Sequence, residues 1–403
     1  MEDADGGLLG ARRGVSGLTV AVGKGLRAVL GLALLVLGYV GFFALSASMA
    51  RYPVVVPKDE APRWARGAFH VHTTRSDGRG TPDAVAAAAK AAGLDFVVLT
   101  DHNDFALRAP AYVQGVLLVP GVEISTSDGH LVAFGMSRPL EGMRAWMPPG
   151  DAVRAVAAAG GTAVLAHPVQ KRNPWKDEAS AKVVPGFELY SADTFFRHAV
   201  RNPVSRLVPA VGASLANPVH GVMLLVAPES EPTARFLELS SERPRVAFCA
   251  HDAHGLPPYR AVFESLAMYL PPEQVPFPLP PDAKEAAEQV SRALGGGQSL
   301  CAFRALGEPG GFALEGLDGV RREAHVGDTL TVRLPGLPDA ESVQVRVWGS
   351  ARLGADGRSV ELTEPGVAQV EVWVRAPGRF FGTEWRPWLV PSPVRVLPPG
   401  PGI

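Results

Sequence analysis

The sequence predicts an α/β protein whose parallel strands close into a barrel, with a membrane-spanning helix before the barrel and a small β-sandwich after it. From Gly67 onward, short apolar runs alternate with helical stretches. Strands separated by helices imply parallel strands joined by crossovers. An uncharged apolar stretch, Val29–Ala50, precedes this region, and strict alternation with Gly and Pro turns follows it from about Gly307. The number of apolar runs favours a closed barrel over an open sheet.

Composition excludes several classes of protein. The 403 residues are enough for two domains, and 47% of them are hydrophobic, which excludes general disorder. The formal net charge of -1 gives no basic field, so we expect no nucleic-acid polymer as a partner. The only cysteines, Cys249 and Cys301, exclude a disulfide scaffold. Both lie in apolar runs, and we expect two buried free thiols.

The stretch Val29–Ala50 is long enough to cross a bilayer, because about 20 apolar residues suffice for a helix. A small-x-small pattern at 48–50 allows a cleaved signal peptide as the alternative, but the long preceding segment favours an uncleaved anchor. Basic residues are balanced on the two sides of the stretch. The short basic tail close to the helix start favours an N-terminus inside, with the rest of the chain outside the cytoplasm, periplasmic or extracellular.

The barrel region contains eight apolar runs that we interpret as buried strands, and four stretches that we interpret as helices. The first helix has Thr81 as a good N-cap, Pro82 in its first turn and Gly93 to end it. The predicted strands are Ala68–Thr73, Phe96–Thr100, Val116–Val119, Leu131–Gly135, Thr162–Ala166, Phe187–Tyr190, Val222–Val226 and Val246–Ala250. The predicted helices after the first are Asp151–Ala159, Pro232–Glu242 and Asp282–Leu294.

The C-terminal region predicts a small antiparallel β-sandwich, because apolar and polar residues alternate in short runs there. The predicted strands are Thr329–Leu334, Val343–Trp348, Val360–Leu362 and Val370–Val374. We therefore divide the chain into a polar tail (1–28), a transmembrane helix or signal anchor (29–50), a linker (51–66), a barrel domain (67–306) and an Ig-like sandwich (307–403).

Histidines and carboxylates follow the ends of the predicted strands. His70 and His72, two positions apart on one strand, point to the same side and can grip one metal ion, and Asp77 follows in a Gly-containing turn. Parallel α/β barrels carry their active sites at the carboxyl ends of their strands, so these side chains should converge. Imidazole and carboxylate together suit Zn, Mn or Fe. The other residues of this kind are His102, Glu123, His130, His167, Asp252 and His254.

Five motifs, in order, resemble those of the PHP (polymerase and histidinol phosphatase) superfamily. They are His-x-His-Thr-x-x-Ser-Asp-Gly at 70–78, Leu-Thr-Asp-His-Asn at 99–103, Gly-Val-Glu-Ile-Ser at 121–125, Ala-His-Pro at 166–168 and Asp-Ala-His at 252–254. The resemblance covers roughly Gly67 to Gly255. It implies a distorted (β/α)7 barrel with two or three divalent metal ions. The segment 384–393 also resembles the closing strand of the sandwich in exported members.

The resemblance implies a role for each candidate ligand. His70, His72, Glu123 and Asp252 would hold one ion. Glu123 would bridge to a second ion, bound also by His130 and His167, and a third would be held by Asp77, His102 and His254. Two ions bridged by a carboxylate suit phosphoryl transfer, in which a hydroxide held between them would attack.

Other residues are candidates for supporting roles. Asp101 could orient a ligand imidazole, or it could cap a turn. His251 should point to the opposite face of its strand from Asp252, which favours a structural role over that of a proton donor to the leaving group. Candidates for a cationic contact with phosphate are Arg75, Lys171 and Arg172.

The function that this pattern favours is a membrane-anchored, metal-dependent phosphoesterase acting on a small phosphomonoester such as a nucleotide. A hydrolase of another bond, an amide or a lactone, on the same metals is the alternative, as is a non-catalytic, metal-stabilised surface module. The irregular segment from Ser191 to Gly221 could be a lid that selects substrate, or an insertion that packs on the membrane side.

Overall fold

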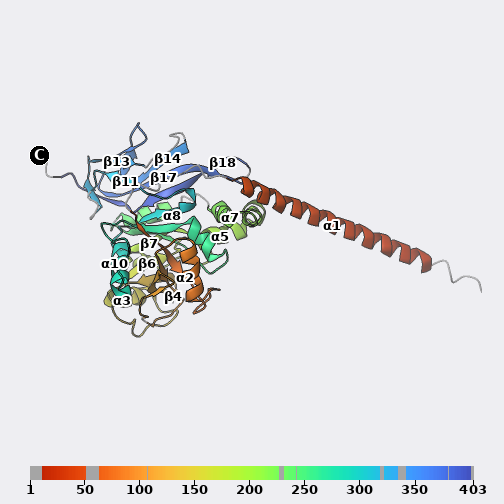
Figure 1. Cartoon of the computed structure of the whole chain (residues 1–403), viewed down its shortest axis with the longest axis horizontal. Coiled ribbons are helices and arrows are strands. Elements are labelled where there is room, and N and C mark those ends of the chain that lie inside the picture. The colour runs from red at the N-terminus through yellow and green to blue at the C-terminus, as the bar shows by residue number, and fades with distance from the viewer. Residues whose placement is uncertain are drawn as a thin grey trace, which may run out of the picture.

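The protein is described here from a computed structural model. It describes residues 11–50, 63–106, 108–226, 231–241, 243–317, 322–334, 342–379 and 381–400, with side chains in the first helix from Leu26 onward. Figure 1 shows three parts: a long protruding helix, an α/β body, and a sheet-rich C-terminal part at one end of the body.

The first helix, α1 (Ala11–Met49), is longer than the sequence analysis predicts. The helix already includes residues 11–28 of the expected polar tail, while residues 1–10 lie outside the described residues. Leu26–Met49 is long and apolar enough to cross a membrane, by length and composition. Residues 51–62 of the expected linker lie outside the described residues, and its last two residues, Ala65 and Arg66, already belong to the first strand.

The body is a ring of seven strands. Strand pairs β1–β2, β2–β4, β6–β7 and β7–β8 are parallel, whereas β5 is antiparallel to both β4 and β6. The ring closes where the His251 amide donates to the Phe69 carbonyl (2.9 Å) and the His72 amide donates to the Ala253 carbonyl (3.0 Å). The strands are β1 (Ala65–Val71), β2 (Phe96–Leu99), β4 (Val116–Thr126), β5 (Gly129–Phe134), β6 (Thr162–Ala166), β7 (Gly186–Ser191) and β8 (Val246–Ala250), with β3 (Ala111–Val113) on the edge of β4.

Helices connect and cover these strands (Figure 1). As expected, the Thr81 hydroxyl accepts a hydrogen bond from the Ala84 amide (3.2 Å) at the start of the first body helix. The helices are α2 (Pro82–Ala91), α3 (Pro149–Ala158), α4 (Glu178–Val183), α5 (Ala192–Arg201), a π-helical turn η1 (Pro203–Leu207), α6 (Val208–Ser214), α7 (Pro218–Leu225), α8 (Glu231–Ser240), α9 (Tyr259–Ser265) and α10 (Ala283–Gly295).

One predicted strand is wrong. Val222–Val226 is not a strand but falls largely in α7, which begins at Pro218, and the Asn217 side chain caps it by accepting from the His220 amide (3.0 Å). A short apolar run cannot be assigned to strand or buried helix by periodicity alone. The other seven predicted strands of this region overlap those of the ring, and the four predicted helices overlap α2, α3, α8 and α10.

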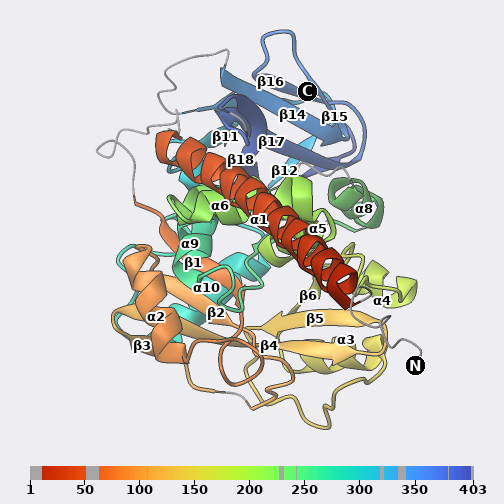
Figure 2. The ribbon, with the colours of Figure 1, turned by 90° about the vertical axis from the view of Figure 1, so that its right-hand side faces the viewer.

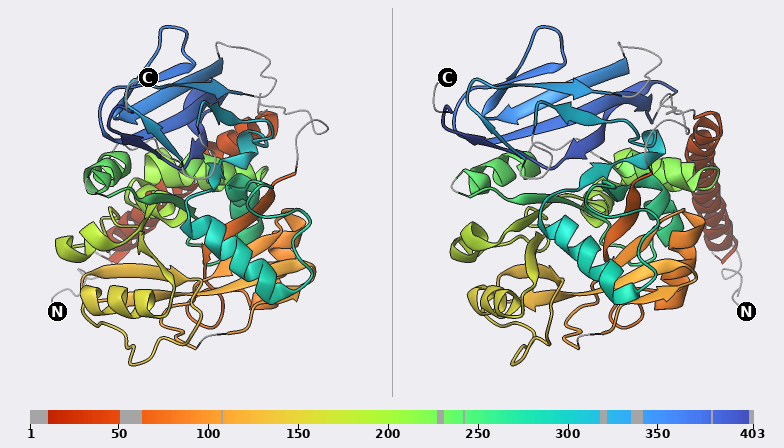
Figure 3. Two further views of the ribbon diagram at one scale, coloured as in Figure 1. Left: turned by 90° about the vertical axis from the view of Figure 1, so that its left-hand side faces the viewer. Right: turned by 60° about the vertical axis from the view of Figure 1, so that its left-hand side comes forward.

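The C-terminal part consists of two sheets that enclose an apolar core (Figure 3). One sheet has the order β11-β13-β16-β15. The other, β12-β19-β17-β18 with β14 paired to β17, continues through β10 and β9 to β1, so a single sheet runs from this part into the body. The strands are β9 (Ala267–Leu270), β10 (Leu300–Ala302), β11 (Ala313–Glu315), β12 (Glu323–His325), β13 (Thr329–Arg333), β14 (Val343–Gly349), β15 (Ala351–Leu353), β16 (Ser359–Leu362), β17 (Gly366–Pro377), β18 (Thr383–Pro391) and β19 (Val394–Leu397), with a 3-10 turn η2 (Arg304–Leu306) after β10.

The two cysteines are not free thiols, contrary to the sequence analysis. Cys249 of β8 and Cys301 of β10 form a disulfide, with their Cα atoms 5.7 Å apart. Burial of both residues led to the expectation of inert thiols. Their proximity could not be read from the sequence, because 52 positions separate them and the fold alone brings β8 and β10 together.

A buried carboxyl group lies between the body and the C-terminal part. The Tyr190 hydroxyl of β7 donates to both carboxyl oxygens of Glu371 (3.1 and 3.0 Å), and the Trp373 indole donates to one of them (2.8 Å). Burial raises the pKa of Glu371 to about 7, although the hydrogen bonds from Tyr190 and Trp373 oppose that shift. The carboxyl group of Glu371 therefore titrates near neutral pH, and it lies in a polar contact between the body and the C-terminal part.

The disulfide should stabilise the folded chain. Replacing both cysteines by alanine (C249A/C301A) should lower the free energy of unfolding by about 2–4 kcal/mol, because the unfolded chain regains the freedom of a long closed loop. Thermal unfolding of the variant and of wild type with and without reductant measures this. If wild type that is denatured without reductant contains two free thiols, the protein has no Cys249–Cys301 disulfide.

Glu371 should make stability depend on pH. Its pKa in the folded protein, about 7, lies above its ordinary value of 4.5. As pH rises, the unfolded chain therefore loses this proton at a lower pH than the folded protein does. The contribution of Glu371 to stability should therefore fall as pH rises from about 4.5 to about 7. Glu371→Gln should remove this part of the pH dependence of the melting temperature, whereas the exposed control Glu364→Gln should not. Identical pH profiles for wild type and Glu371→Gln would contradict the assignment.

Candidate metal centre

The nine candidate ligands meet at the carboxyl end of the ring. Glu123, which is 1% exposed, lies at their centre. Its Oε2 atom is 3.1 Å from His70 Nε2, 3.1 Å from His72 Nε2 and 3.2 Å from His102 Nδ1. Its Oε1 atom is 2.8 Å from His130 Nδ1 and 3.1 Å from His167 Nε2. One buried carboxylate thus contacts five imidazoles, which come from in or beside four strands, β1, β2, β5 and β6.

The remaining carboxylates flank this centre on two sides. Asp252 Oδ1 lies 3.4 Å from His70 Nε2 and 3.3 Å from His72 Nε2. Asp77, at the solvent-exposed edge, lies 3.3 Å from His254 Nε2 and 3.8 Å from His102 Nε2. Three groups have candidate ligand atoms within 4.8 Å of one another: His70, His72, Glu123 and Asp252; His72, Asp77, His102 and His254; and His102, Glu123 and His130.

The residues present fit divalent cations. Five buried atoms of the candidate ligands have no hydrogen-bond partner within the described part of the chain: His167 Nδ1, and four that meet around Glu123, namely His70 Nε2, His72 Nε2, His102 Nδ1 and Glu123 Oε2. Buried polar atoms are ordinarily satisfied, so four that converge on one place call for a cation between them. Mixed nitrogen and oxygen donors are the set that Zn, Mn or Fe accept.

Electrostatics keep both central carboxyl groups ionised. Burial alone would raise the pKa of Glu123 and of Asp252, but the surrounding imidazoles, His70 first among them, lower both well below the usual range. Conversely, burial lowers the pKa of His72 and His167, but the neighbouring carboxylates outweigh it and raise both to about 9. A metal cation that displaces the protons of these imidazoles would therefore bind beside two ionised carboxylates, Glu123 and Asp252.

The backbone is strained at three candidate ligands. His70, His167 and Asp252 have φ values of 64°, 33° and 45°, in the left-handed region that non-glycine residues rarely adopt. Such conformations persist where the surrounding structure enforces them, typically at functional sites. Here the strain turns side chains at strand ends toward the common centre.

Glu188 is a residue of this centre that the sequence analysis missed. It lies in β7, it is 2% exposed, and its Oε1 atom is 2.6 Å from His70 Nδ1. Its Oε2 atom accepts from the His167 amide (2.7 Å). Glu188 thus fixes the orientation of the His70 ring and the start of the His167 loop. A carboxylate inside the apolar run Phe187–Tyr190 was the signal that could have revealed it.

The structure bears on two other sequence-based roles. Asp101 makes the hydrogen bonds of a turn cap: it accepts from the Thr73 amide (2.7 Å), the Thr73 hydroxyl (2.8 Å) and the Ser76 hydroxyl (2.9 Å) in the turn after β1. The same Ser76 hydroxyl lies 3.4 Å from His72 Nδ1, so Asp101 reaches a candidate ligand through Ser76. His251 accepts from the Phe69 amide (3.2 Å) and lies 2.8 Å from the Leu266 carbonyl. Burial lowers its pKa to about 4. With both ring nitrogens engaged by the backbone, His251 has the structural role rather than that of a proton donor.

The three predicted phosphate contacts are not part of the cluster. Arg75, Lys171 and Arg172 are exposed, and no ion pair joins them to the nine candidate ligands in the described structure.

Another cation, Arg197 of α5, pairs with Asp193 and is attracted by Asp252 and Asp77. Asp193 also accepts a hydrogen bond from the side-chain amide of Gln170 (3.2 Å). Burial and the charge of Asp252 raise the pKa of Asp193 to about 6.

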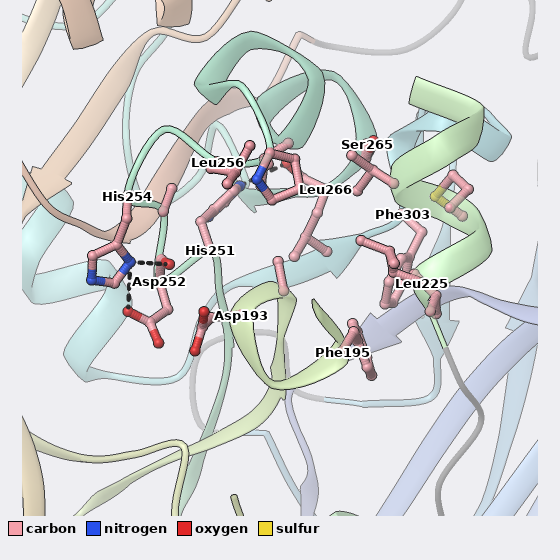
Figure 4. A pocket seen from close by; sticks show the side chains of 17 residues that line it. Asp193, Phe195, Leu225, His251, Asp252, His254, Leu256, Ser265, Leu266 and Phe303 are labelled. Atoms are coloured by element: carbon pink, nitrogen blue, oxygen red, sulfur yellow. Dashed lines mark hydrogen bonds and ion pairs between the residues drawn. The ribbon is translucent and has the colours of Figure 1, made fainter. Parts of the chain in front are cut away.

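An apolar pocket adjoins the cluster (Figure 4). Asp193, Asp252 and His254 lie at one end of it, and mostly apolar side chains of α5, α7, α9 and the segments beside them form the rest of its wall. The apolar residues labelled in the figure are Phe195, Leu225, Leu256, Leu266 and Phe303. A substrate held at the cluster would therefore have an acidic and an apolar surface beside it.

Comparison with known proteins gives distant likenesses. No protein-family model matches this chain, and no curated protein does. Among solved structures, a two-domain protein of Bacteroides vulgatus with a PHP-like domain, assigned by prediction as a metal-dependent phosphoesterase, is 14% identical, with 84% of this chain and 99% of that chain covered and a TM-score of 0.36. A protein of Bifidobacterium adolescentis provisionally assigned as a metal-dependent phosphoesterase is 17% identical (49% and 90% covered, TM-score 0.31).

An amidohydrolase of Chromobacterium violaceum with bound sulfate is 15% identical, with 47% of this chain and 87% of that chain covered and a TM-score of 0.29. At these identities and TM-scores the likenesses carry no argument about this chain. The assignment of its function therefore rests on its own residues and their geometry.

Glu188 should control metal affinity. Glu188→Gln keeps an acceptor for the His167 amide but removes the negative charge beside His70, so metal affinity should fall by about 10–100-fold, as for other groups that orient metal ligands. Metal retained against a competing chelator is the measurement. The control Glu178→Gln, on the exposed face of α4, should retain metal as wild type does. Equal retention in both variants would remove Glu188 from the centre.

Proposed function

We propose that this protein is a metal-dependent phosphoesterase that hydrolyses a small phosphomonoester at a centre of two or three divalent ions. The observation that carries the proposal is the convergence of unsatisfied buried imidazole and carboxylate atoms on Glu123. Such a centre would supply an activated water and would offset the charge that develops on the phosphoryl oxygens. The ions would be Zn, Mn or Fe, in keeping with the donor set.

Each candidate ligand has a proposed place in this centre. We assign His70, His72, Glu123 and Asp252 to one ion, in keeping with the first of the three groups. Glu123 would bridge to a second ion through the oxygen that faces His130 and His167. Asp77, His102 and His254, with His72 nearby, would hold the third, at the exposed edge.

The remaining residues of the site would bind and orient the substrate. Arg197 is half-buried beside Asp193 and is the cation best placed to meet a phosphate at the centre. Asp193, whose pKa lies near 6, can hold or release a proton close to neutral pH, which suits a group that protonates a leaving oxygen. The apolar pocket would exclude water on that side.

The fold and location that we propose follow from the same features. We infer that the closed ring with its one antiparallel strand is the distorted (β/α)7 barrel of the PHP superfamily, and that the C-terminal sheets are an Ig-like sandwich. We further propose that α1 anchors the chain in a membrane, with the catalytic part outside the cytoplasm. The disulfide supports that side, because disulfides persist in oxidising compartments.

The test of the function is phosphate release by the purified, full-length protein. Loaded with Mn or Zn, it should release phosphate from a broad panel of phosphomonoesters, and chelation of the metal should abolish this. Asp252→Asn should lose activity, because it removes a charge at the centre, whereas Asp151→Asn on the surface of α3 should keep it. Hydrolysis of amides or lactones without phosphate release would instead select the alternative activity.

A further inference from the structure

Among the residues of α1 whose side chains the structure describes, those that contact the body lie in the last third of the helix. The Tyr39 hydroxyl donates to the Val204 carbonyl (3.0 Å), and Phe43 and Ala47 are each 1% exposed. A Cβ atom at Gly212 of α6 would lie 2.7 Å from the Val40 carbonyl oxygen, so the close approach of α6 to α1 requires glycine. Small residues at such contacts are typical of helix packing in membranes. Figure 2 shows α1 crossing α6, and Figure 1 shows the rest of it projecting from the body.

The uncharged part of the projecting helix is too short to cross a bilayer by itself. Residues 26–38 are all exposed, but Arg27 ends the apolar run on that side. From Ala28 to Gly38 a helix rising about 1.5 Å per residue spans about 16 Å. The hydrocarbon core is about 30 Å thick. If α1 spans it, the turns that carry Tyr39 and Phe43 lie inside the bilayer, together with whatever packs against them.

The elements packed against those turns expose apolar side chains. Val204 of η1 is 71% exposed, and Val211 and Leu215, of α6 and just after it, are 50% and 72% exposed. Val200 at the end of α5 is 47% exposed. Phe381, between β17 and β18, is 57% exposed, with its ring 5.2 Å from that of Phe42 on α1. These five residues form what we name the collar of α1.

The charge of the segment between Asp193 and Glu229 also suits a position at a bilayer surface. Between Asp193 and Glu229 the sequence contains no acidic residue. The charged residues that it does contain are arginines; Arg201 ends α5, and Arg206 lies in η1. Arginine near a bilayer surface is attracted to anionic lipid headgroups, whereas a carboxylate is repelled.

We propose that the collar inserts into the leaflet around the C-terminal end of α1, so that a lipid bilayer is the partner of this surface. The inference rests on the membrane anchor of the proposed function and goes beyond it: the body is embedded at its edge and not merely tethered. α5, η1 and α6 follow the carboxyl end of β7, which is the end of the ring that carries the metal centre. Helix α5 thus joins the two places: Asp193 in its first turn lines the pocket beside Asp252 and His254, and Val200 in its last turn belongs to the collar.

The test is the depth of labels in full-length protein reconstituted in phosphatidylcholine vesicles that contain anionic phosphatidylglycerol. An environment-sensitive fluorophore is attached to single cysteines at Val204, Leu215, Leu34 and Val183, while the native cysteines remain bonded. Val183, 50% exposed on α4 before β7, is the matched aqueous control, and Leu34 reports on α1 itself. Metal content of each variant reports on folding.

Labels at Val204 and Leu215 should shift their emission to shorter wavelength and be quenched by nitroxide lipids, as at Leu34, while Val183 is quenched by aqueous iodide. Aqueous behaviour at Val204 and Leu215 with a buried Leu34 would overturn the collar but leave the anchor. Aqueous behaviour at Leu34 as well would overturn both. Protection of Val204 and Leu215 from iodide and from nitroxide lipids alike would overturn lipid as the partner and indicate a protein cover.

Discussion

The ionised side chain of Glu123 is the group around which the rest of this structure is arranged. An isolated carboxylate that is 1% exposed is strongly unfavourable, because it loses its hydration in a medium of low polarity. Five imidazoles offset that cost, and they reach Glu123 only because the ring of strands closes between β8 and β1 and brings its carboxyl ends together. Strain at His70, His167 and Asp252 and the carboxylate of Glu188 then hold the rings in place.

The candidate ligands could be predicted from the sequence because chemistry and topology coincide there. Most of them lie at or just after the end of an apolar run, and runs separated by helices must present their carboxyl ends at one edge. The same reasoning could not find Glu188, because its side chain reaches the centre from within a strand and not from a strand end. Arg197 was missed for a related reason: a helix following β7 brings it back toward the cluster.

The differences from the sequence analysis have different physical causes. Asp101 could have oriented an imidazole or capped a turn, and hydrogen bonds from Thr73 and Ser76 place it at the turn after β1. Val222–Val226 has the composition of a strand, but the cap at Asn217 and the proline after it commit the segment to a helix. The disulfide joins positions that only the completed fold brings together. A local cap thus outweighed composition in the helix, whereas the disulfide depends on distant parts of the chain.

The disulfide links the maturation of the metal centre to the compartment of the protein. Cys249 precedes Asp252 by three positions, and its bond fixes the end of β8 to β10, which in turn pairs with β18 of the C-terminal part. A chain still in a reducing cytoplasm lacks that tie, and its Asp252 loop is held by fewer constraints. If the body lies outside the cytoplasm, as we propose, metal loading is then favoured after export and oxidation. Such an order would keep the proposed phosphoesterase idle among the phosphate esters of the cytoplasm.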